Sequence, residues 1–534
     1  MKNLGKNLAI TAVILFIALP AFTAKPKLWK VNKDGSVDIE MWYGSAVTEA
    51  GPPPTNWIAY KIIKERLGIN LILTALPSST ADQNAKIITA GTKNALPDIF
   101  MISTEAFSLL AKQGLLANVD DMYAMMPDRT TKLYDSDARE FTTVKGHSYA
   151  LAQPGTIARN EGILIREDWL QKLHLPVPKT LDEFFSVMEA FTQGDPDGNG
   201  RHDTWGYGAF LEVTPTNEGL GKRFDPIFGA FGVAGTWNLT KAHFGLNVTK
   251  PEYFEAMQYV KKLVDERVID PNWASYQKDA FRAAWKQGNF GIFREQNAAY
   301  ASESNYAPFD QNFPNGNLVI IDPPIGPKGF SSAGTYTVSY RMYALSAQTA
   351  KQSVKVNGKK VTKMQKIAEL LEWMSSDEGY YLLGWGQLGV NYMLDKNGIP
   401  TVEGLPDASK GYSKTEMQPL TQLRNLVYYN SNIELGARYP TYTTLSQKEM
   451  SALKALREMQ SKAWTPCVGV DLLPAPDAAL KAFYEQGILD FVTGQRELTK
   501  ANWDNWVTQL YEQEGGKEWE AAARKIAEEN RLLK

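Results

Sequence analysis

The segment Asp195–Asp203 carries the clearest chemistry in this sequence. Its oxygen-bearing side chains are Asp195, Asp197, Asn199 and Asp203. These residues occupy positions 1, 3, 5 and 9 of a calcium-binding loop, and a hard cation such as Ca²⁺ requires about 6–8 oxygen ligands. Gly200 falls at position 6, where the chain must turn sharply, and Arg201 at position 7 would offer its backbone carbonyl. Since Asp, Asn and Gly also dominate ordinary polar turns, a metal-free turn is the alternative.

The calcium loop, residues 195–206, lacks one ligand of the complete EF-hand pattern. Position 12 is Gly206, where a full EF-hand has a bidentate Glu. Water or a residue from elsewhere in the chain must therefore complete the site. Nothing in the loop is catalytic, so we expect Ca²⁺ to be structural.

A second group of residues could bind a flat or ring-shaped ligand. Trp42 and Tyr43 end the first expected strand, and ligands of open α/β sheets lie beyond the carboxyl ends of the strands. A sugar ring offers an apolar face to an aromatic side chain and hydroxyls to polar ones. The predicted ligand-binding residues are Trp42, Tyr43, Arg159, Trp205, Trp237, Arg294, Glu295, Gln296 and Tyr392.

Each member of this set also has a structural interpretation. Any single Trp is more often packed in a core than placed at a ligand. Arg159, Arg294 and Arg341 could bind a carboxylate, or each could form a structural ion pair. The sequence leaves these alternatives open.

Motifs of catalysis are absent. The four histidines form no HExxH or comparable pair, and the single cysteine, Cys467, has no nucleophile motif around it. No GxSxG, P-loop or strand-following GxGxxG is present. Carboxylate pairs of glycosidases depend on spatial separation and stay open as an alternative. The pattern favours binding over catalysis.

Composition and the N-terminus indicate an exported protein. Lys2 and Lys6 precede an apolar run from Leu8 to Leu19 that is too short to span a membrane, so residues 1–24 are predicted to be a signal peptide. A net charge of −2 without a basic stripe argues against nucleic acid as partner. The single cysteine excludes an internal disulfide, and no lipid-bearing cysteine stands near the signal.

The elements that must position these residues alternate between strands and helices. Apolar strands are expected at residues 37–44, 69–76 and 96–103, with helices over 58–67 and 105–113 between and after them. Thr180-Leu-Asp-Glu183 predicts a capping box that begins a helix through Phe191. The fold class is therefore α/β, and 534 residues suggest two domains.

Several blocks of sequence resemble a known family. They are Glu161-Gly-Ile-Leu-Ile-Arg-Glu-Asp-Trp-Leu170, Pro178-Lys-Thr-Leu-Asp-Glu-Phe184, Asp195-Pro-Asp-Gly-Asn-Gly200, Gln287-Gly-Asn-Phe-Gly291 and Ser376-Asp-Glu-Gly-Tyr-Tyr-Leu-Leu383. In this order they resemble the extracellular solute-binding proteins of carbohydrate ABC importers, in the subgroup that includes alginate-oligosaccharide-binding proteins and many lipoproteins.

The resemblance implies a two-lobed, periplasmic-binding-protein-like fold with interleaved lobes joined at a hinge and a helical C-terminal extension. We expect the N-lobe to comprise residues 25–153 and about 297–345, and the C-lobe residues about 154–296 and 346–534. The resemblance also implies a structural Ca²⁺ held by Asp195, Asp197, Asn199, the Arg201 carbonyl and Asp203.

The leading hypothesis is a non-enzymatic, monomeric substrate-binding component of an ABC importer that captures an oligosaccharide between its lobes and delivers it to a membrane permease. One alternative is a secreted, calcium-stabilised polysaccharide-degrading enzyme. Another is a cell-surface scaffold protein, but such a protein is expected to have internal repeats or duplicated calcium motifs, and the sequence shows neither. Without a lipobox cysteine, the protein is expected to be periplasmic, tethered by its signal, or extracellular.

Overall fold

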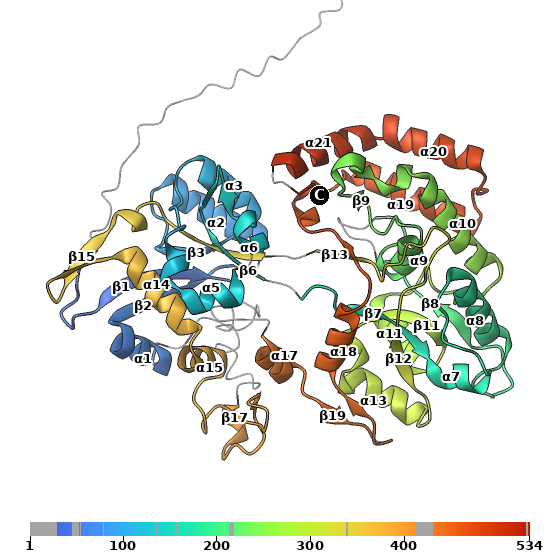
Figure 1. Ribbon diagram of the computed structural model, residues 1–534, viewed down its shortest axis with the longest axis horizontal. Coiled ribbons are helices and arrows are strands. Elements are labelled where there is room, and N and C mark those ends of the chain that lie inside the picture. Colours follow the sequence, from blue (N-terminus) through green and yellow to red (C-terminus); the bar gives the residue numbers. More distant parts are fainter. Residues whose placement is uncertain are drawn as a thin grey trace, which may run out of the picture.

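A computed structural model gives the fold of this chain. It describes residues 29–44, 53, 55–77, 79–134, 136–154, 157–212, 218–337, 340–411, 431–529 and 532–533. The predicted signal peptide, residues 1–24, lies outside this part of the chain. Two lobes stand side by side along the longest axis of the molecule (Figure 1).

The first lobe is built on a five-stranded mixed sheet of order β2-β1-β3-β14-β6. Strands β1 (Val37–Tyr43), β2 (Ile69–Ala75) and β3 (Ile99–Ile102) are parallel. Strands β14 (Tyr340–Leu345) and β6 (Leu151–Pro154) complete the sheet, and β14 is antiparallel to both of its neighbours. Buried and half-buried residues alternate strictly along β1, so its odd-numbered residues face the core.

Helices cover both faces of this sheet. Helices α1 (Ile58–Leu67), α2 (Thr80–Thr92) and α3 (Thr104–Lys112) connect or follow the parallel strands. Ser79 and Ser103 cap the N-termini of α2 and α3 by accepting hydrogen bonds from backbone N–H groups. The later helices α14 (Lys363–Met374) and α15 (Asp377–Trp385) return to this lobe and join the core under β1 and β3.

The second lobe contains a four-stranded sheet of order β12-β7-β11-β8. Its strands are β7 (Glu161–Arg166), β8 (Trp205–Gly208), β11 (Phe290–Gln296) and β12 (Leu318–Ile321). β7 is buried along its whole length, as a central strand covered on both faces must be.

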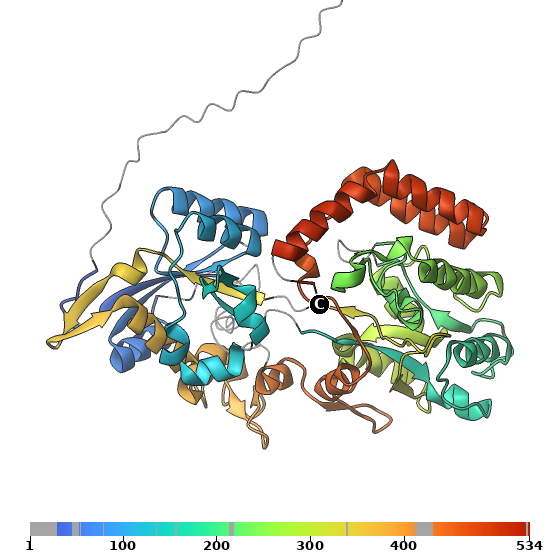
Figure 2. The same cartoon turned by 45° about the horizontal axis from the view of Figure 1, so that its top comes forward.

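Helices again cover the sheet of the second lobe. Helix α8 (Leu181–Gln193) begins at the capping box that the sequence predicted, with Thr180 and Glu183 bonding reciprocally. The large core of the lobe also takes in α10 (Pro251–Asp265) and the C-terminal helices α19 (Ala478–Thr493), α20 (Lys500–Glu512) and α21 (Gly516–Glu529). These C-terminal helices form the arc over the second lobe in Figure 2.

Within the described residues, three passages between the lobes can be followed. The first leads from β6 to β7 and includes residues 157–160, and the second leads from β12 to β14 and includes residues 322–337 with β13 (Thr335–Tyr336). The third follows α17 (Asn432–Arg438), whose Ala437 belongs to the first core, and leads to α18 (Ala452–Gln460) in the second. β13 pairs in parallel with β21 (Thr465–Pro466), so the second passage is held to the C-terminal part of the chain.

The predicted lobe boundaries were wrong for two segments. Residues 297–337 were expected in the N-lobe, but β12 pairs with β7 in the second sheet. Residues 346–534 were expected in the C-lobe, but the buried stripe of α14 packs in the first core. An apolar strand or an amphipathic helix fits either sheet, and only spatial pairing decides between them. The second crossing therefore follows Ile321, well after position 296.

Candidate functional site

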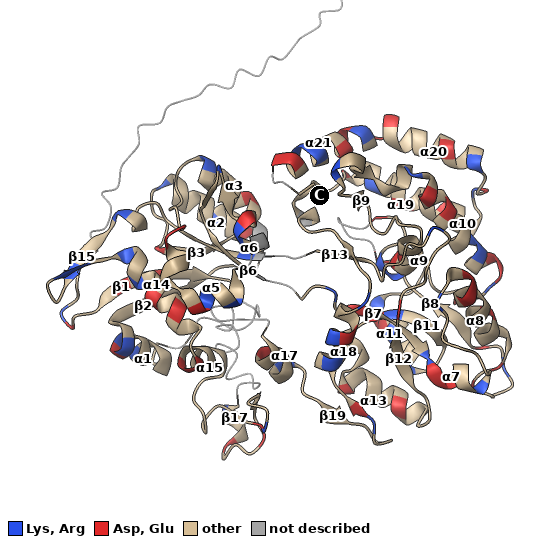
Figure 3. Cartoon of the chain, in the orientation of Figure 1, with Lys and Arg blue, Asp and Glu red and all other residues tan. Residues whose placement is uncertain are grey.

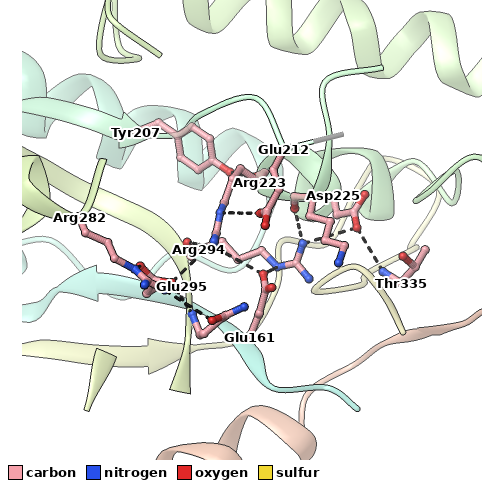
Figure 4. A network of polar contacts seen from close by, with 11 residues as sticks. Glu161, Tyr207, Glu212, Arg223, Asp225, Arg282, Arg294, Glu295 and Thr335 are labelled. Carbon is pink, nitrogen blue, oxygen red and sulfur yellow. Dashed lines mark hydrogen bonds and ion pairs between the residues drawn. The ribbon is translucent and has the colours of Figure 1, made fainter. Parts of the chain in front are cut away.

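A buried ionic network lies where the passages meet the second lobe (Figure 4). Glu161 is the first residue of β7, and Arg294 lies on the neighbouring strand β11, where its register partner is Ile163. The Glu161 Oε2 atom is 3.4 Å from Arg294 Nε and 3.4 Å from Arg223 Nη1. Burial alone would raise the pKa of Glu161, but the Arg294 and Arg223 guanidiniums outweigh it and lower that pKa to about 2. Glu161 is therefore a buried carboxylate.

Further carboxylates neutralise the two arginines. Glu295 accepts a bidentate pair of hydrogen bonds from Arg282, both of 3.0 Å, and lies 3.7 Å from Arg223 Nη2. Glu212 lies 3.3 Å from Arg223 Nε. Burial would lower the pKa of Arg223, but Glu161, Glu295 and Glu212 together raise it. Arg223 and Glu295 are fully buried, so the network is a structural part of the lobe.

This network contacts the first two passages and the segment between α18 and β21. Glu161 ends the first passage, and the Asp225 carboxylate accepts a 3.3 Å hydrogen bond from the Thr335 backbone N–H in the second. Arg294 lies with its guanidinium carbon 5.6 Å from the Trp464 ring centroid, next to β21. The geometry thus fixes the second-lobe ends of the crossing segments relative to one another.

A small aromatic cluster lies on the first two passages and on the segment between α18 and β21. The rings of Tyr336 and Trp464 meet edge to face with centroids 6.3 Å apart. The Arg159 guanidinium carbon lies 5.3 Å from the Tyr336 ring centroid, and its Nη1 donates to the Gln460 carbonyl. The side chains of Arg159, Tyr336 and Trp464 are half-buried, so each keeps part of its surface exposed. Aromatic faces beside a guanidinium are suited to a ring-shaped polar ligand.

A cavity of about 380 Å³ is lined by both lobes. Its first-lobe wall comes from α3, from Glu140 and Phe141 at the end of α6 (Ser136–Phe141), and from residues 143–146. Leu472 and Glu529 of the second lobe close the other side. The lobes therefore approach each other through the C-terminal end of α21 as well as through the passages.

Several residues predicted to bind ligand are core residues in the structure. Tyr43, Trp237 and Tyr392 are 0%, 2% and 5% exposed. Tyr43 lies on the core-facing side of β1, while Trp237 packs against Phe244 and Trp519. Each ring is covered by protein, which favours the packing alternative for all three.

The remaining predicted residues are distributed between two regions. Trp42 is half-buried and lies on the face of β1 opposite to Tyr43, with the Lys86 ammonium 4.6 Å from its ring centroid. Trp205 packs against the core of α11 (Lys278–Lys286) and β11. Arg294, Glu295 and Gln296 stand on β11 in or beside the ionic network, and Arg341 is half-buried on β14. The structure brings together Arg159, Arg294, Glu295 and Gln296 of the predicted set, and it separates them from Trp42.

The predicted calcium loop is a compact turn. The Asp195 carboxylate accepts hydrogen bonds from the backbone N–H groups of Gly198, Asn199 and Gly200. The Asn199 side-chain Nδ2 donates to Asp197 Oδ2 at 2.7 Å and to Asp203 Oδ1 at 3.1 Å. Burial, followed by repulsion from Asp203 and Asp195, raises the pKa of Asp197.

The loop supplies hard oxygen donors but no preformed metal cage. Across the described ranges, no group of three or more His, Cys, Asp or Glu side chains is placed to hold a metal ion. Asn199 Nδ2 lies between the carboxylates of Asp197 and Asp203 and donates a hydrogen bond to each. A cation at this position would likewise reduce the repulsion between the two carboxylates. The donor set fits Ca²⁺, with the Arg201 carbonyl at position 7.

A family model for bacterial extracellular solute-binding proteins matches residues 60–355, which is more than half of the chain. The chain belongs to this family. This solute-binding protein is 26% identical over 437 residues to the polygalacturonan/rhamnogalacturonan-binding protein YtcQ of Bacillus subtilis (strain 168), with 79% of this chain and 80% of that protein covered.

Solved structures have the same two-lobed fold. One is a solute-binding protein described as HMO-binding and ABC-transporter-associated, from Bifidobacterium longum infantis ATCC 15697. Its TM-score is 0.62 at 17% identity, and the match covers 94% of this chain and all of that one. Another is the alginate-binding protein AlgQ2 without calcium ion, with a TM-score of 0.53 at 15% identity and coverage of 92% and 98%. At these identities the likeness shows the fold alone.

Sequence reasoning missed the residues that join the network to the passages. Arg223 and Asp225 stand where a short 3-10 helix (Lys222–Phe224) leads into α9 (Asp225–Ala230), and no pattern predicts that they are buried. Tyr336 and Trp464 are separated by more than a hundred residues and meet through the pairing of β13 with β21. The only signal in the sequence was Glu161, a charged residue beginning an apolar strand.

Proposed function

We propose that this solute-binding protein is the substrate-binding component of a carbohydrate ABC importer and captures an acidic oligosaccharide between its lobes. The observation that carries the proposal is the cluster of Arg159 and Tyr336, on the first two passages, with Trp464, between α18 and β21. The family assignment and the pectin-related name of one relative support it.

The chemistry of the cluster suits a uronate sugar. An aromatic ring packs on the apolar face of a pyranose, while a guanidinium donates paired hydrogen bonds to a carboxylate. Arg159 uses Nη1 on the Gln460 carbonyl and stands half-buried with a φ of 56°, in the left-handed region that is uncommon outside glycine.

Capture would work by a change in the lobe arrangement. A ligand that contacts both lobes stabilises the arrangement in which those contacts form together. Because the ionic network holds the passages to the second lobe, bending would be confined to their first-lobe side, close to β6 and β14. The permease would then distinguish the liganded arrangement, and no chemical step on the sugar is needed.

The same proposal gives the loop of residues 195–206 a structural Ca²⁺. Asp195, Asp197, Asn199, the Arg201 carbonyl and Asp203 would supply the ligands, and water would complete the shell. The ion would relieve repulsion among carboxylates and stabilise the turn between α8 and β8. The name of the AlgQ2 structure, which mentions calcium, is in keeping with this role.

A thermal-shift and scattering experiment tests the ligand class. Oligogalacturonides and rhamnogalacturonan oligosaccharides should raise the melting temperature and reduce the radius of gyration, whereas maltooligosaccharides of equal length should do neither. Reducing ends should stay constant on prolonged incubation. Release of new reducing ends would favour the degrading enzyme, and an absence of response to every acidic oligosaccharide would overturn the proposal.

A further inference from the structure

A projecting hairpin of the first lobe carries an unusual concentration of positive charge. Residues 351–363, here called the lysine hairpin, contain five lysines and no Asp or Glu. The whole chain, by contrast, has 57 basic and 59 acidic residues. The lysines are Lys351, Lys355, Lys359, Lys360 and Lys363.

Two of these lysines stand directly opposite each other. Strands β15 (Ser353–Val356) and β16 (Lys359–Thr362) are antiparallel, and their register pairs Lys355 with Lys360. Directly opposed side chains lie on one face of the ribbon, and like charges there destabilise the pair. The repulsion between Lys355 and Lys360 therefore destabilises the hairpin, and no acidic residue of the hairpin offsets it.

Acidic partners do not relieve this charge. Lys351, Lys355, Lys359 and Lys360 are exposed, and no ion pair found within the described ranges includes any of them. Lys363 differs, since it is buried against Asp98 at the base of the hairpin. Four ammonium groups are therefore directed to solvent.

The hairpin is held rigidly, so these charges are presented in a fixed arrangement. Asn357 and Gly358 form its turn with φ values of 49° and 79°, as a two-residue turn of type I′ requires. Val354 and Val356 pack against the core of the first lobe. At the other end, Thr362 caps helix α14 through a capping box.

The hairpin lies at the outer end of the first lobe, beside the first described residues of the chain. Figure 1 shows β15 at the end of the longest axis, on the side away from the second lobe, and Figure 3 shows its basic colour. The Trp29 ring centroid is 5.5 Å from Lys363 Nζ, and both residues line one pocket with Lys30. Lys30 and Lys33 are also exposed, and neither takes part in an ion pair among the described residues. The basic surface thus extends from the hairpin to the N-terminal segment.

We propose that this basic surface, made of Lys30, Lys33, Lys351, Lys355, Lys359 and Lys360, binds the anionic headgroups of a phospholipid membrane. Lysine ammoniums act as point charges toward phosphates, and several exposed lysines near an anionic surface add their attraction. The hairpin has no aromatic residue on which a sugar could stack, which favours headgroups over a polyanionic polysaccharide.

Vesicle co-sedimentation tests this inference on the protein purified after export. Vesicles of phosphatidylglycerol and phosphatidylcholine should bind it, and vesicles of phosphatidylcholine alone should not. Replacing Lys351, Lys355, Lys359 and Lys360 by Gln should weaken binding to the anionic vesicles at least about tenfold, since each lysine near the surface contributes to the attraction. Raising the salt concentration should have a similar effect on the wild-type protein.

A matched variant controls for the change in net charge. Lys241, Lys278, Lys454 and Lys525 are exposed on the second lobe and take part in no ion pair among the described residues. Their replacement by Gln should leave vesicle binding unchanged. Equal losses in both variants, or no loss in the hairpin variant, would overturn the proposal.

Two further measurements show whether a loss of vesicle binding comes from the hairpin itself, from unfolding or from failure of the proposed function. Unchanged far-ultraviolet circular dichroism and melting temperature show that the hairpin variant is folded, and unchanged oligosaccharide binding distinguishes this result from failure of the proposed function. If the hairpin variant lost affinity for polygalacturonate polymer but kept its affinity for anionic vesicles, the surface would be a polysaccharide site and the membrane proposal would be wrong.

Discussion

Arg294 Nε lies 3.4 Å from Glu161 Oε2, and this contact joins β11 to the first residue of β7. Both side chains are almost fully buried, with Glu161 5% and Arg294 2% exposed. Because β7 begins where the first passage ends, the pair holds the second-lobe end of that passage in place. A buried pair of this kind is expensive to break, since the remaining charge stays desolvated.

Glu161→Gln should destabilise the protein by about 3 kcal/mol at pH 7, because it leaves two buried guanidiniums without this carboxylate. The folded-state pKa of about 2 lies below the ordinary value of 4.5, so the contribution of Glu161 is present above about pH 4.5 and is lost as the pH falls toward 2. Urea unfolding across this range measures it. The control is Glu252→Gln, which removes a half-exposed pair with Lys328 and should cost less than about 1 kcal/mol. An equal cost for both variants would contradict the role of the network.

Trp464→Ala and Tyr336→Ala should each weaken binding of the acidic oligosaccharide about tenfold, since each removes an aromatic face worth about 1 kcal/mol or more. Trp464→Phe should retain part of the affinity, because the indole N–H is already bonded to the Met459 carbonyl. Isothermal titration calorimetry measures these changes. Trp373→Ala, on α14 of the first lobe, should leave the affinity unchanged. If Trp373→Ala had the larger effect, the ligand would lie elsewhere.

Removal of calcium should lower the melting temperature without abolishing oligosaccharide binding. Chelation of the wild-type protein and Asp197→Ala should have the same effect, and chelation should add nothing to the variant, because both remove one site. Differential scanning calorimetry with and without added Ca²⁺ measures this. Asp182→Ala, which removes an exposed acid of α8 outside the loop, should still respond to calcium. Loss of sugar affinity in a folded Asp197→Ala variant would show that the loop serves the ligand site directly.

Glu218→Gln should stabilise the protein at pH 8 by up to about 3 kcal/mol. Burial raises the pKa of Glu218 to about 7, although the Thr236 hydroxyl donates to Oε2 at 2.9 Å and Lys481 lies 3.7 Å from Oε1. With a raised folded-state pKa, the stability associated with the protonated carboxyl is fully present below about pH 4.5 and is lost as the pH rises through about 7. The advantage of the variant should therefore shrink on acidification. Unfolding curves at several pH values measure it, and a pH-independent difference would contradict the assignment.

Local structure was largely predictable from this sequence, because its signals act over a few residues. The capping box at Thr180 and Glu183, the helix over residues 58–67 and the strand expected at 69–76 all formed where the sequence indicated, the strand as Ile69–Ala75. Each depends on hydrogen bonds or steric preferences that neighbours in the chain determine.

Long-range placement was not predictable to the same degree. β12 and β14 have similar apolar patterns, yet one pairs with β7 and the other with β3. Trp237 was assigned to a ligand because it stands in a glycine-rich loop, but Trp519, far along the chain, covers its ring. Burial of that kind arises from contacts between distant elements, which a single sequence does not encode as a pattern.

The two ends of the described chain belong to different lobes, which has a practical consequence. Trp29 packs with the core of the first lobe, and Leu532 packs with the core of the second. Two fluorophores attached near these positions would be carried by different lobes. A change in the distance between the lobes would therefore change the efficiency of energy transfer between them, which would report ligand capture in real time without a label inside the binding region.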